Sequence, residues 1–295
     1  MHINVKTVLG IFLFLFFGFM ALWLITENNS DQLKTLDGSI LRISYFKPEL
    51  FALVFMPLLV ATGWRVWSGE SHWSSVWFHS GVPLGLIASS ISLIGVLQNV
   101  ANLEQARNLV GESLLAVFYG GVASLIGYLN LVNVDIQIKS KSRSNISKFL
   151  VSLLAALPIA VGMDYYSGIM AFVEFSTVLI IAAVASAFLL VNRDESKSIC
   201  HLVCKAMVIA SLASVIVALV SYSTYQAYPE LTGPAIAIGI LGPLYGSFVI
   251  FQCAIFLPET DLRETNFGRI NWHLLEIYGL WILMCFAPKS LLEMF

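Results

Sequence analysis

Long apolar segments follow one another along almost the whole chain, and they constrain its fold more than any other feature. A helix needs roughly 20 apolar residues to cross about 30 Å of hydrocarbon. The segments lack the period-2 alternation of barrel strands, and a helix satisfies its own backbone hydrogen bonds in lipid. The predicted spans are Thr7–Ile25, Leu50–Val66, Val82–Val100, Val110–Val132, Phe149–Met163, Phe172–Val191, Leu202–Tyr222 and Pro234–Leu257.

The composition supports a membrane protein. Of 295 residues, 58% are hydrophobic and 12% are charged, whereas soluble domains carry about 25% charged residues. The net charge of -2 gives no reason to expect a nucleic-acid partner. We therefore predict an all-α polytopic protein embedded in the lipid bilayer, with about eight transmembrane helices.

The C-terminal stretch, residues 271–295, is too interrupted by charge for a clean span. Its apolar core, Ile277–Ala287, has 11 residues, and a helix of that length does not cross the hydrocarbon. The pattern favours an amphipathic helix at the cytoplasmic membrane surface. A ninth span is the alternative.

Basic residues predict the orientation. With eight spans and both ends inside, 12 of the 16 Lys and Arg residues fall on the inner side. The segment Gln137–Lys148 alone carries four basic residues and no acidic one. Because inner loops are enriched in Lys and Arg, we expect cytoplasmic N- and C-termini and a multi-pass location in the inner (plasma) membrane.

An internal repeat relates the two halves of the chain. A shift of about 125 residues lays Glu49 on Glu174, each at the start of an apolar span, and Leu86–Ile91 on Ser211–Ile216. Each half holds an even number of spans, so the copies run parallel. We therefore expect two parallel four-helix repeats.

A shift one residue longer aligns the fourth spans. It lays Tyr119 and Gly120 on Tyr245 and Gly246. The predicted organisation is a first four-helix repeat (1–136), a basic cytoplasmic linker (137–148), a second four-helix repeat (149–258) and a C-terminal cytoplasmic or interfacial helix (259–295).

Three spans resemble those of a known family. Gly81–Ile94, followed by Leu97–Asn99, resembles the third span of the flagellar stator A subunit, a Pro- and Gly-bearing helix that ends in a Gln-Asn loop. Gly233–Ile238 leading to Leu244–Gly246 resembles its fourth span, and Phe172–Ile180 its second. The chain thus resembles the MotA/TolQ/ExbB family of proton-channel proteins, as a tandem duplication without the large cytoplasmic domain.

The resemblance implies a stator-like subunit that couples proton or sodium flow to work. It implies assembly into an oligomer around a single-span membrane partner, whose intramembrane Asp carries the ion. No predicted span holds a central acidic residue of its own, and Glu49 and Glu174 lie at span starts. The resemblance places these residues along the ion pathway: Pro83, Gly85, Ser89, Ser92, Tyr119, Gly120, Ser214, Gly233, Pro234, Tyr245 and Gly246.

Departures from the family leave two other functions open. The family has two threonines before the Tyr-Gly of its fourth span, where this chain has Ala116-Val117 and Gly242-Pro243. The large cytoplasmic insertion shrinks in the first half to an aromatic loop, Trp67–Gly81. A nonconducting scaffold or regulator, or a small-solute transporter with parallel repeats, are therefore the alternatives.

Catalytic and metal-binding patterns do not stand out in the sequence. It has no Gly-rich phosphate loop and no His/Glu zinc motif. Cys200 and Cys204 are four residues apart, but no fourth ligand accompanies them and His201. We expect no enzymatic activity, no metal and no cofactor.

Overall fold

The computed structural model describes residues 47–68, 73–99, 103–132, 145–192, 199–225, 229–256 and 269–279. Within these ranges the ordered elements are helices, and none is a strand. Seven helical segments are long and apolar enough to cross a membrane. The predicted all-α membrane class is confirmed at this level. The first predicted span, Thr7–Ile25, lies outside the described residues.

Each of the other predicted spans overlaps one helix. A short 3₁₀ helix, η1 (Ile169–Phe172), precedes α6, and residues 269–279 form a further helical segment. The helices are α2 (Pro48–Trp67), α3 (Trp73–Gln98), α4 (Leu103–Val132), α5 (Asn145–Ser167), α6 (Phe175–Val191), α7 (Ile199–Tyr225) and α8 (Pro229–Phe256).

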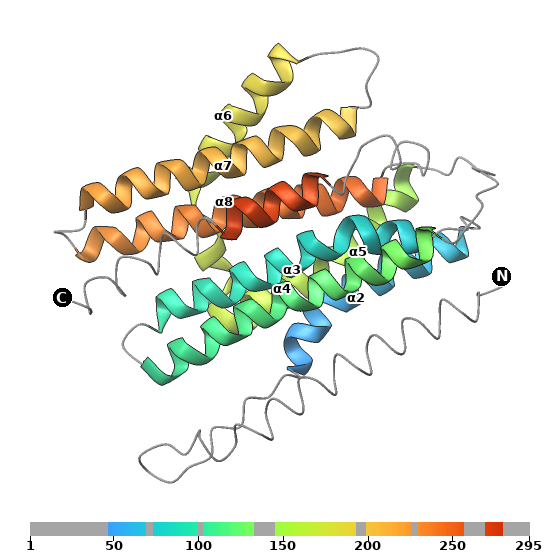
Figure 1. Cartoon of the computed structure of the whole chain (residues 1–295), viewed down its shortest axis with the longest axis horizontal. Helices are drawn as coiled ribbons and strands as arrows, with labels where there is room; N and C mark the ends of the chain where they lie inside the picture. Colours follow the sequence, from blue (N-terminus) through green and yellow to red (C-terminus); the bar gives the residue numbers. More distant parts are fainter. Residues whose placement is uncertain are drawn as a thin grey trace, which may run out of the picture.

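Four helices stand side by side in the order α4, α3, α8, α7 (Figure 1). Helix α3 is the most enclosed of the candidate membrane helices. In its most apolar stretch of 18 residues, 89% of the residues are buried, against 17% in the corresponding stretch of residues 169–191. Residues 269–279, red in Figure 1, lie against α3, with which Asn271 and Tyr278 form hydrogen bonds. We call the two ends of the bundle the Trp73 end and the Gln98 end, after the first and last residues of α3.

Helix α5 packs against α2 and α3 rather than against α6, which follows it in the chain. A Cβ added to Gly162 of α5 would lie 2.8 Å from the methyl groups of Leu53 in α2. The sequence assigns this span to the second repeat, residues 149–258. Most of its contacts are with α2 and α3 of the first half, and fewer join it to η1 and α8.

Two basic side chains hold the last turn of α8. Arg65 of α2, which is 1% exposed, donates through Nη2 to the carbonyl of Ala254 at 3.0 Å. Lys148 of α5 donates through Nζ to the carbonyl of Phe256 at 3.1 Å. The last carbonyls of a helix lack intrahelical donors and carry partial negative charge. Both contacts therefore stabilise this helix end and tie α2 and α5 to α8.

Helix α3 begins at Trp73, well before the predicted start at Val82. The prediction of an aromatic loop over Trp67–Gly81 is therefore wrong from Trp73 onward. Hydropathy treats polar residues as solvent-exposed, whereas here they point into the bundle. Trp77 Nε1, for example, donates to Thr62 Oγ1 at 2.8 Å. The buried polar residues of this first part of α3 are Ser74, Ser75, His79 and Ser80.

We expect Gly120→Ala to lower the melting temperature of the protein in detergent. The new Cβ would lie 2.6 Å from the Gly81 carbonyl oxygen and 2.7 Å from Gly85 Cα, and these backbone atoms move only with the whole helix. Such overpacking costs about 1–3 kcal/mol.

Gly63→Ala is the matched control for this substitution. Nothing lies within 4 Å of a Cβ at Gly63, and alanine favours a helix over glycine by about 1 kcal/mol. Scanning fluorimetry compares the two variants. Equal melting temperatures would contradict the close approach of α3 and α4.

Candidate functional site

The residues predicted to line the pathway in the third span lie inside the bundle. Ser92 Oγ donates to the carbonyl of Ala88 in its own helix at 3.2 Å. The Ser89 hydroxyl forms a hydrogen bond with the Tyr278 hydroxyl. At Ser89, therefore, α3 faces residues 269–279. The predicted pathway residues that α3 buries are Pro83, Gly85, Ser89 and Ser92.

Glycines bring the backbones of α3 and α4 into contact. A Cβ on Gly85 would lie 2.9 Å from Gly120 Cα, and a Cβ on Gly120 would lie 2.6 Å from the carbonyl oxygen of Gly81. A real Cβ essentially never approaches this closely. Only glycine fits at these positions with the present helix separation.

Helices α7 and α8 make the corresponding contact 126 residues later in the chain. A Cβ on Gly246 of α8 would meet Ser211 Oγ and would lie 3.2 Å from the carbonyl oxygen of Met207. Met207, Ser211 and Gly246 follow Gly81, Gly85 and Gly120 by the same 126 residues.

A second set of positions that lie 126 residues apart also forms matching contacts, at the Trp73 end of the bundle. A Cβ on Gly127 of α4 would lie 2.7 Å from the carbonyl oxygen of Ser74 and 2.8 Å from Phe78 Cα. The positions 126 residues later are all cysteines. There the Cys253 thiol of α8 lies within hydrogen-bond reach of both Cys200 and Cys204 of α7.

Tyr119 and Tyr245 occupy matching places in this arrangement. Tyr119 Oη accepts a hydrogen bond at 3.3 Å from the backbone N–H of Lys47, directly before α2. Tyr245 Oη accepts one at 3.3 Å from the backbone N–H of Glu174, directly before α6, and donates to the carbonyl of Phe172. Backbone N–H groups at a helix start lack intrahelical acceptors. Each tyrosine therefore anchors the start of an outer helix.

Ser89 and Ser214, which the sequence pairs, differ in their contacts. Ser214 Oγ donates to the carbonyl of Ile238 in α8 at 3.3 Å, whereas Ser89 bonds to Tyr278. A register of 126 residues places Ser214 opposite Ala88. The two serines are therefore not equivalent in the register of 126 residues that relates the contacts between α3 and α4 to those between α7 and α8.

The remaining predicted residues lie at helix starts. Glu174 is the N-cap of α6, where its carboxylate accepts from the Thr177 backbone N–H at 2.7 Å. Glu49 lies in the first turn of α2. Gly233 and Pro234 lie near the start of α8, and a Cβ on Gly233 would meet nothing within 4 Å.

A polar pocket of about 360 Å³ opens at the Gln98 end. Lys47 Nζ forms an ion pair with Glu112 Oε1 at 2.9 Å, and Tyr166 Oη donates to Glu112 Oε2 at 3.1 Å. The Glu112 carboxylate holds the pKa of Lys47 above its ordinary value, so the ammonium group stays charged at neutral pH. The pocket is lined by Lys47, Glu49, Asn99, Gln105, Asn108, Leu109, Glu112, Tyr165 and Tyr166.

We expect Glu112→Gln to lower the melting temperature because it removes one charge from the ion pair with Lys47. The pair is partly exposed, at 38% for Lys47 and 13% for Glu112, so the expected loss is about 1 kcal/mol. Glu49→Gln is the control, since it makes the same change in the same pocket and leaves the pair intact. A larger loss in Glu49→Gln than in Glu112→Gln would contradict this assignment.

No protein-family model, no curated protein and no solved structure matches this chain. The contacts described above and the resemblance of the spans to the stator family are therefore the basis for a proposed function.

Proposed function

We propose that the chain is a stator-like membrane subunit that couples the flow of protons or sodium ions to work on a single-span partner. It consists of two equivalent units, which contribute the helix pairs α3/α4 and α7/α8. The proposal includes an inner-membrane location with both termini cytoplasmic, and assembly of several chains into one complex.

The recurrence of contacts 126 residues apart carries this proposal. The glycine contacts of α3 with α4 recur between α7 and α8, and the anchor made by Tyr119 recurs at Tyr245. These helices hold the segments that resemble the third and fourth spans of the family. A shared function of the two pairs explains why the contacts repeat while most side chains differ.

The order of the helices supports assembly with further chains. In the row α4, α3, α8, α7, helix α3 of the first unit packs against α8, the counterpart of α4 in the second unit (Figure 1). Such a contact joins two different surfaces, and head-to-tail contacts of this kind generate rings or filaments when repeated. Among the described residues, α4 and α7 each expose apolar side chains that could repeat it, Phe118 in α4 and Ile216, Val217 and Val220 in α7.

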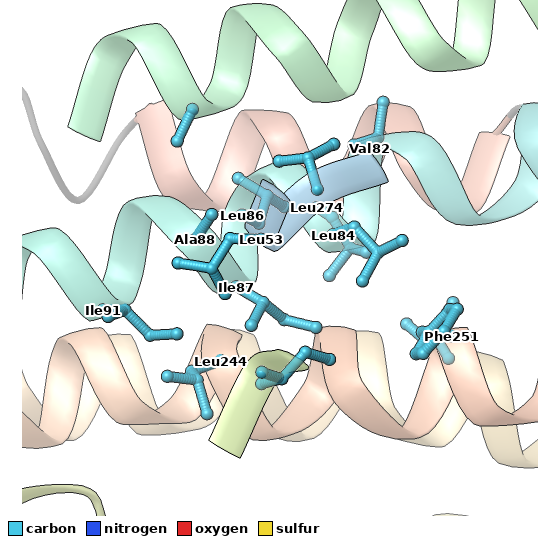
Figure 2. Packing of buried hydrophobic residues seen from close by; sticks show 14 of the residues in the cluster. Leu53, Val82, Leu84, Leu86, Ile87, Ala88, Ile91, Leu244, Phe251 and Leu274 are labelled. Atoms are coloured by element: carbon cyan, nitrogen blue, oxygen red, sulfur yellow. The ribbon is translucent and has the colours of Figure 1, made fainter. Parts of the chain in front are cut away.

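The outer face of α4 corresponds to the face that α8 buries against α3. Leu244 of α8 lies across from Ile87 and Ile91 of α3 (Figure 2) and is 1% exposed. Its counterpart in α4, Phe118, is 49% exposed. A Cβ on Gly121 of the same outer face would meet nothing within 4 Å. Small residues are enriched where membrane helices meet, and Gly121 has no such neighbour among the described residues.

The outer face of α7 corresponds in the same way to the face that α3 buries against α8. Ile91 of α3 is fully buried, whereas its counterpart Val217 is 39% exposed. Ile216 and Val220 are exposed beside it. We therefore expect α7 of one chain to pack against α4 of the next, with Val217 near Phe118.

Photo-crosslinking tests this contact. We expect p-benzoylphenylalanine at position 118 to join two chains, and the joined peptide to contain Val217. A product of twice the chain mass is a link between two molecules. Within one chain, α4 and α7 lie at opposite ends of the row (Figure 1), so a link to Val217 is expected to come from another chain. The same probe at Phe175, an exposed aromatic position in α6, is the control. A product formed within one chain, with residues 1–46, would contradict the contact.

Ion flow is tested with protein purified in mild detergent, together with any single-span partner that co-purifies, and reconstituted into liposomes. We expect ion uptake along an imposed gradient. We expect the double variant Ser89→Ala/Ser214→Ala to reduce it while co-purification persists, because the pathway loses two hydroxyl groups. Ser223→Ala is the control, since this exposed hydroxyl donates within α7, to the Val220 carbonyl at 2.8 Å.

Full uptake in the double variant would contradict the pathway along α3 and α7. No uptake by the wild-type complex would favour the nonconducting scaffold.

The polar pocket favours a second candidate, a small-solute transporter. It places a carboxylate, an ammonium group, amides and phenols around about 360 Å³, as sites for small polar ligands do. A solute that raises the melting temperature of the wild-type protein but not of Glu112→Gln would support this function.

A further inference from the structure

The helical segment 269–279 lies alongside the middle of α3. Asn271 Nδ2 donates to the Phe78 carbonyl at 3.2 Å, and the hydroxyls of Tyr278 and Ser89 share a hydrogen bond. At 1.5 Å per residue, Ser89 lies about 24 Å along a helix roughly 39 Å long. Leu274 packs among the buried side chains of the same region (Figure 2). The segment therefore follows α3 inward from the Trp73 end to mid-depth.

This placement differs from a helix that lies flat across the end of the bundle. Ile270, Leu274 and Ile277 are buried together with Tyr278, and the hydrogen bonds with α3 run lengthwise. Whether residues 280–295 continue the helix lies outside the described residues.

The opposite side of the segment carries an acid and an imidazole. His273 Nδ1 lies 3.0 Å from Glu276 Oε2, and the two side chains are 49% and 54% exposed. Glu276 precedes Tyr278 by two residues, so it lies about 3 Å from the level of Tyr278 along the axis. The pair therefore sits near mid-depth, on the side of the segment turned away from α3.

Glu276 is the one carboxylate among the described residues at this depth. Glu112 is tied to Lys47, which directly precedes α2. Glu174 caps α6. The other described acids also lie near helix ends: Glu49, Glu104, Asp164 and Glu230.

An ionisable pair at mid-depth does not face hydrocarbon, because a charged group there is strongly disfavoured. Its exposed side needs water, a counter-charge or a bound cation. Carboxylate oxygens are suitable ligands for a proton or a sodium ion, and an imidazole within hydrogen-bond reach exchanges protons with them.

We propose that Glu276, with His273 beside it, is the ion-binding site of this protein, and that it takes up a proton or a sodium ion from the pathway along α3. The site lies in the chain's own C-terminal segment, whereas the sequence leads to the expectation of a carboxylate from a partner. This inference rests on the proposed ion-coupled function. It specifies where the ion is held and which surface must be enclosed by polar groups or by further chains.

Labelling with dicyclohexylcarbodiimide tests the site independently of ion flow, because this apolar reagent reacts with protonated carboxyl groups inside membranes. We expect the purified complex in liposomes to form an adduct that mass spectrometry locates at Glu276. Sodium ions that prevent the adduct would identify sodium as the ligand, and labelling that sodium leaves unchanged would identify the proton. Adducts on other carboxylates with none on Glu276 would overturn the proposal.

Ion uptake by variants gives the second readout. We expect Glu276→Gln to reduce uptake to the level of empty liposomes, and Glu276→Asp to restore part of it. Asp164→Asn, which changes an exposed acid near the end of α5, is the control. Full uptake by Glu276→Gln would overturn the site while leaving the ion-coupled function in place. An adduct on Glu276 in a wild-type complex that shows no uptake would contradict the ion-coupled function instead.

Discussion

The close approach of α3 to α4 determines the rest of the arrangement. Gly85 and Gly120 let the two backbones meet, and in a bilayer such packing of small residues, rather than hydrophobic burial, drives helices together. With one face occupied by α4, helix α3 has its remaining faces for α8, for α2 and α5, and for residues 269–279. The most enclosed helix of the described chain thus contacts α2, α4, α5, α8 and residues 269–279.

This central position has a consequence for function. A partner span cannot reach Ser89 directly, because Tyr278 of the chain's own C-terminal segment already bonds to it. The segment that occupies this face brings Glu276 level with the middle of α3, where the described helices offer hydroxyl groups and no acid. In the proposed mechanism the bundle supplies a rigid wall, and the C-terminal segment supplies the group that binds the ion. A partner then receives the movement rather than carrying the ion.

Much of the fold is readable from the sequence, because apolar length predicts spans without any knowledge of their neighbours. The sequence also matches Tyr119-Gly120 with Tyr245-Gly246. In the structure both tyrosines accept a hydrogen bond from a backbone N–H directly before a helix, and both glycines lie against the neighbouring helix. The sequence does not predict in this way which helices pack against each other. Nothing local in α5, for example, indicates that it packs on Leu53 of α2. The start of α3 is missed because the polar side chains around His79 are buried within the bundle.

The candidate site shows the same limit. Lys47, Glu112 and Tyr166 are distant in sequence, and only the packing of helix ends brings them into one pocket. Residues 271–295 are predicted to lie at the membrane surface because charges interrupt their short apolar core, Ile277–Ala287. Within the described part, hydrogen bonds to Phe78 and Ser89 place the segment against α3, and pairwise contacts of this kind leave no periodic pattern in a single sequence.

An experimental structure of the purified complex in lipid nanodiscs, determined by cryo-electron microscopy, tests the central claim most directly. The account predicts that α7 of one chain packs against α4 of the next, in the register of the α3–α8 contact, and that Glu276 faces an enclosed polar space. A single chain with α4 and α7 bounded by lipid, or a C-terminal segment detached from α3, would contradict it.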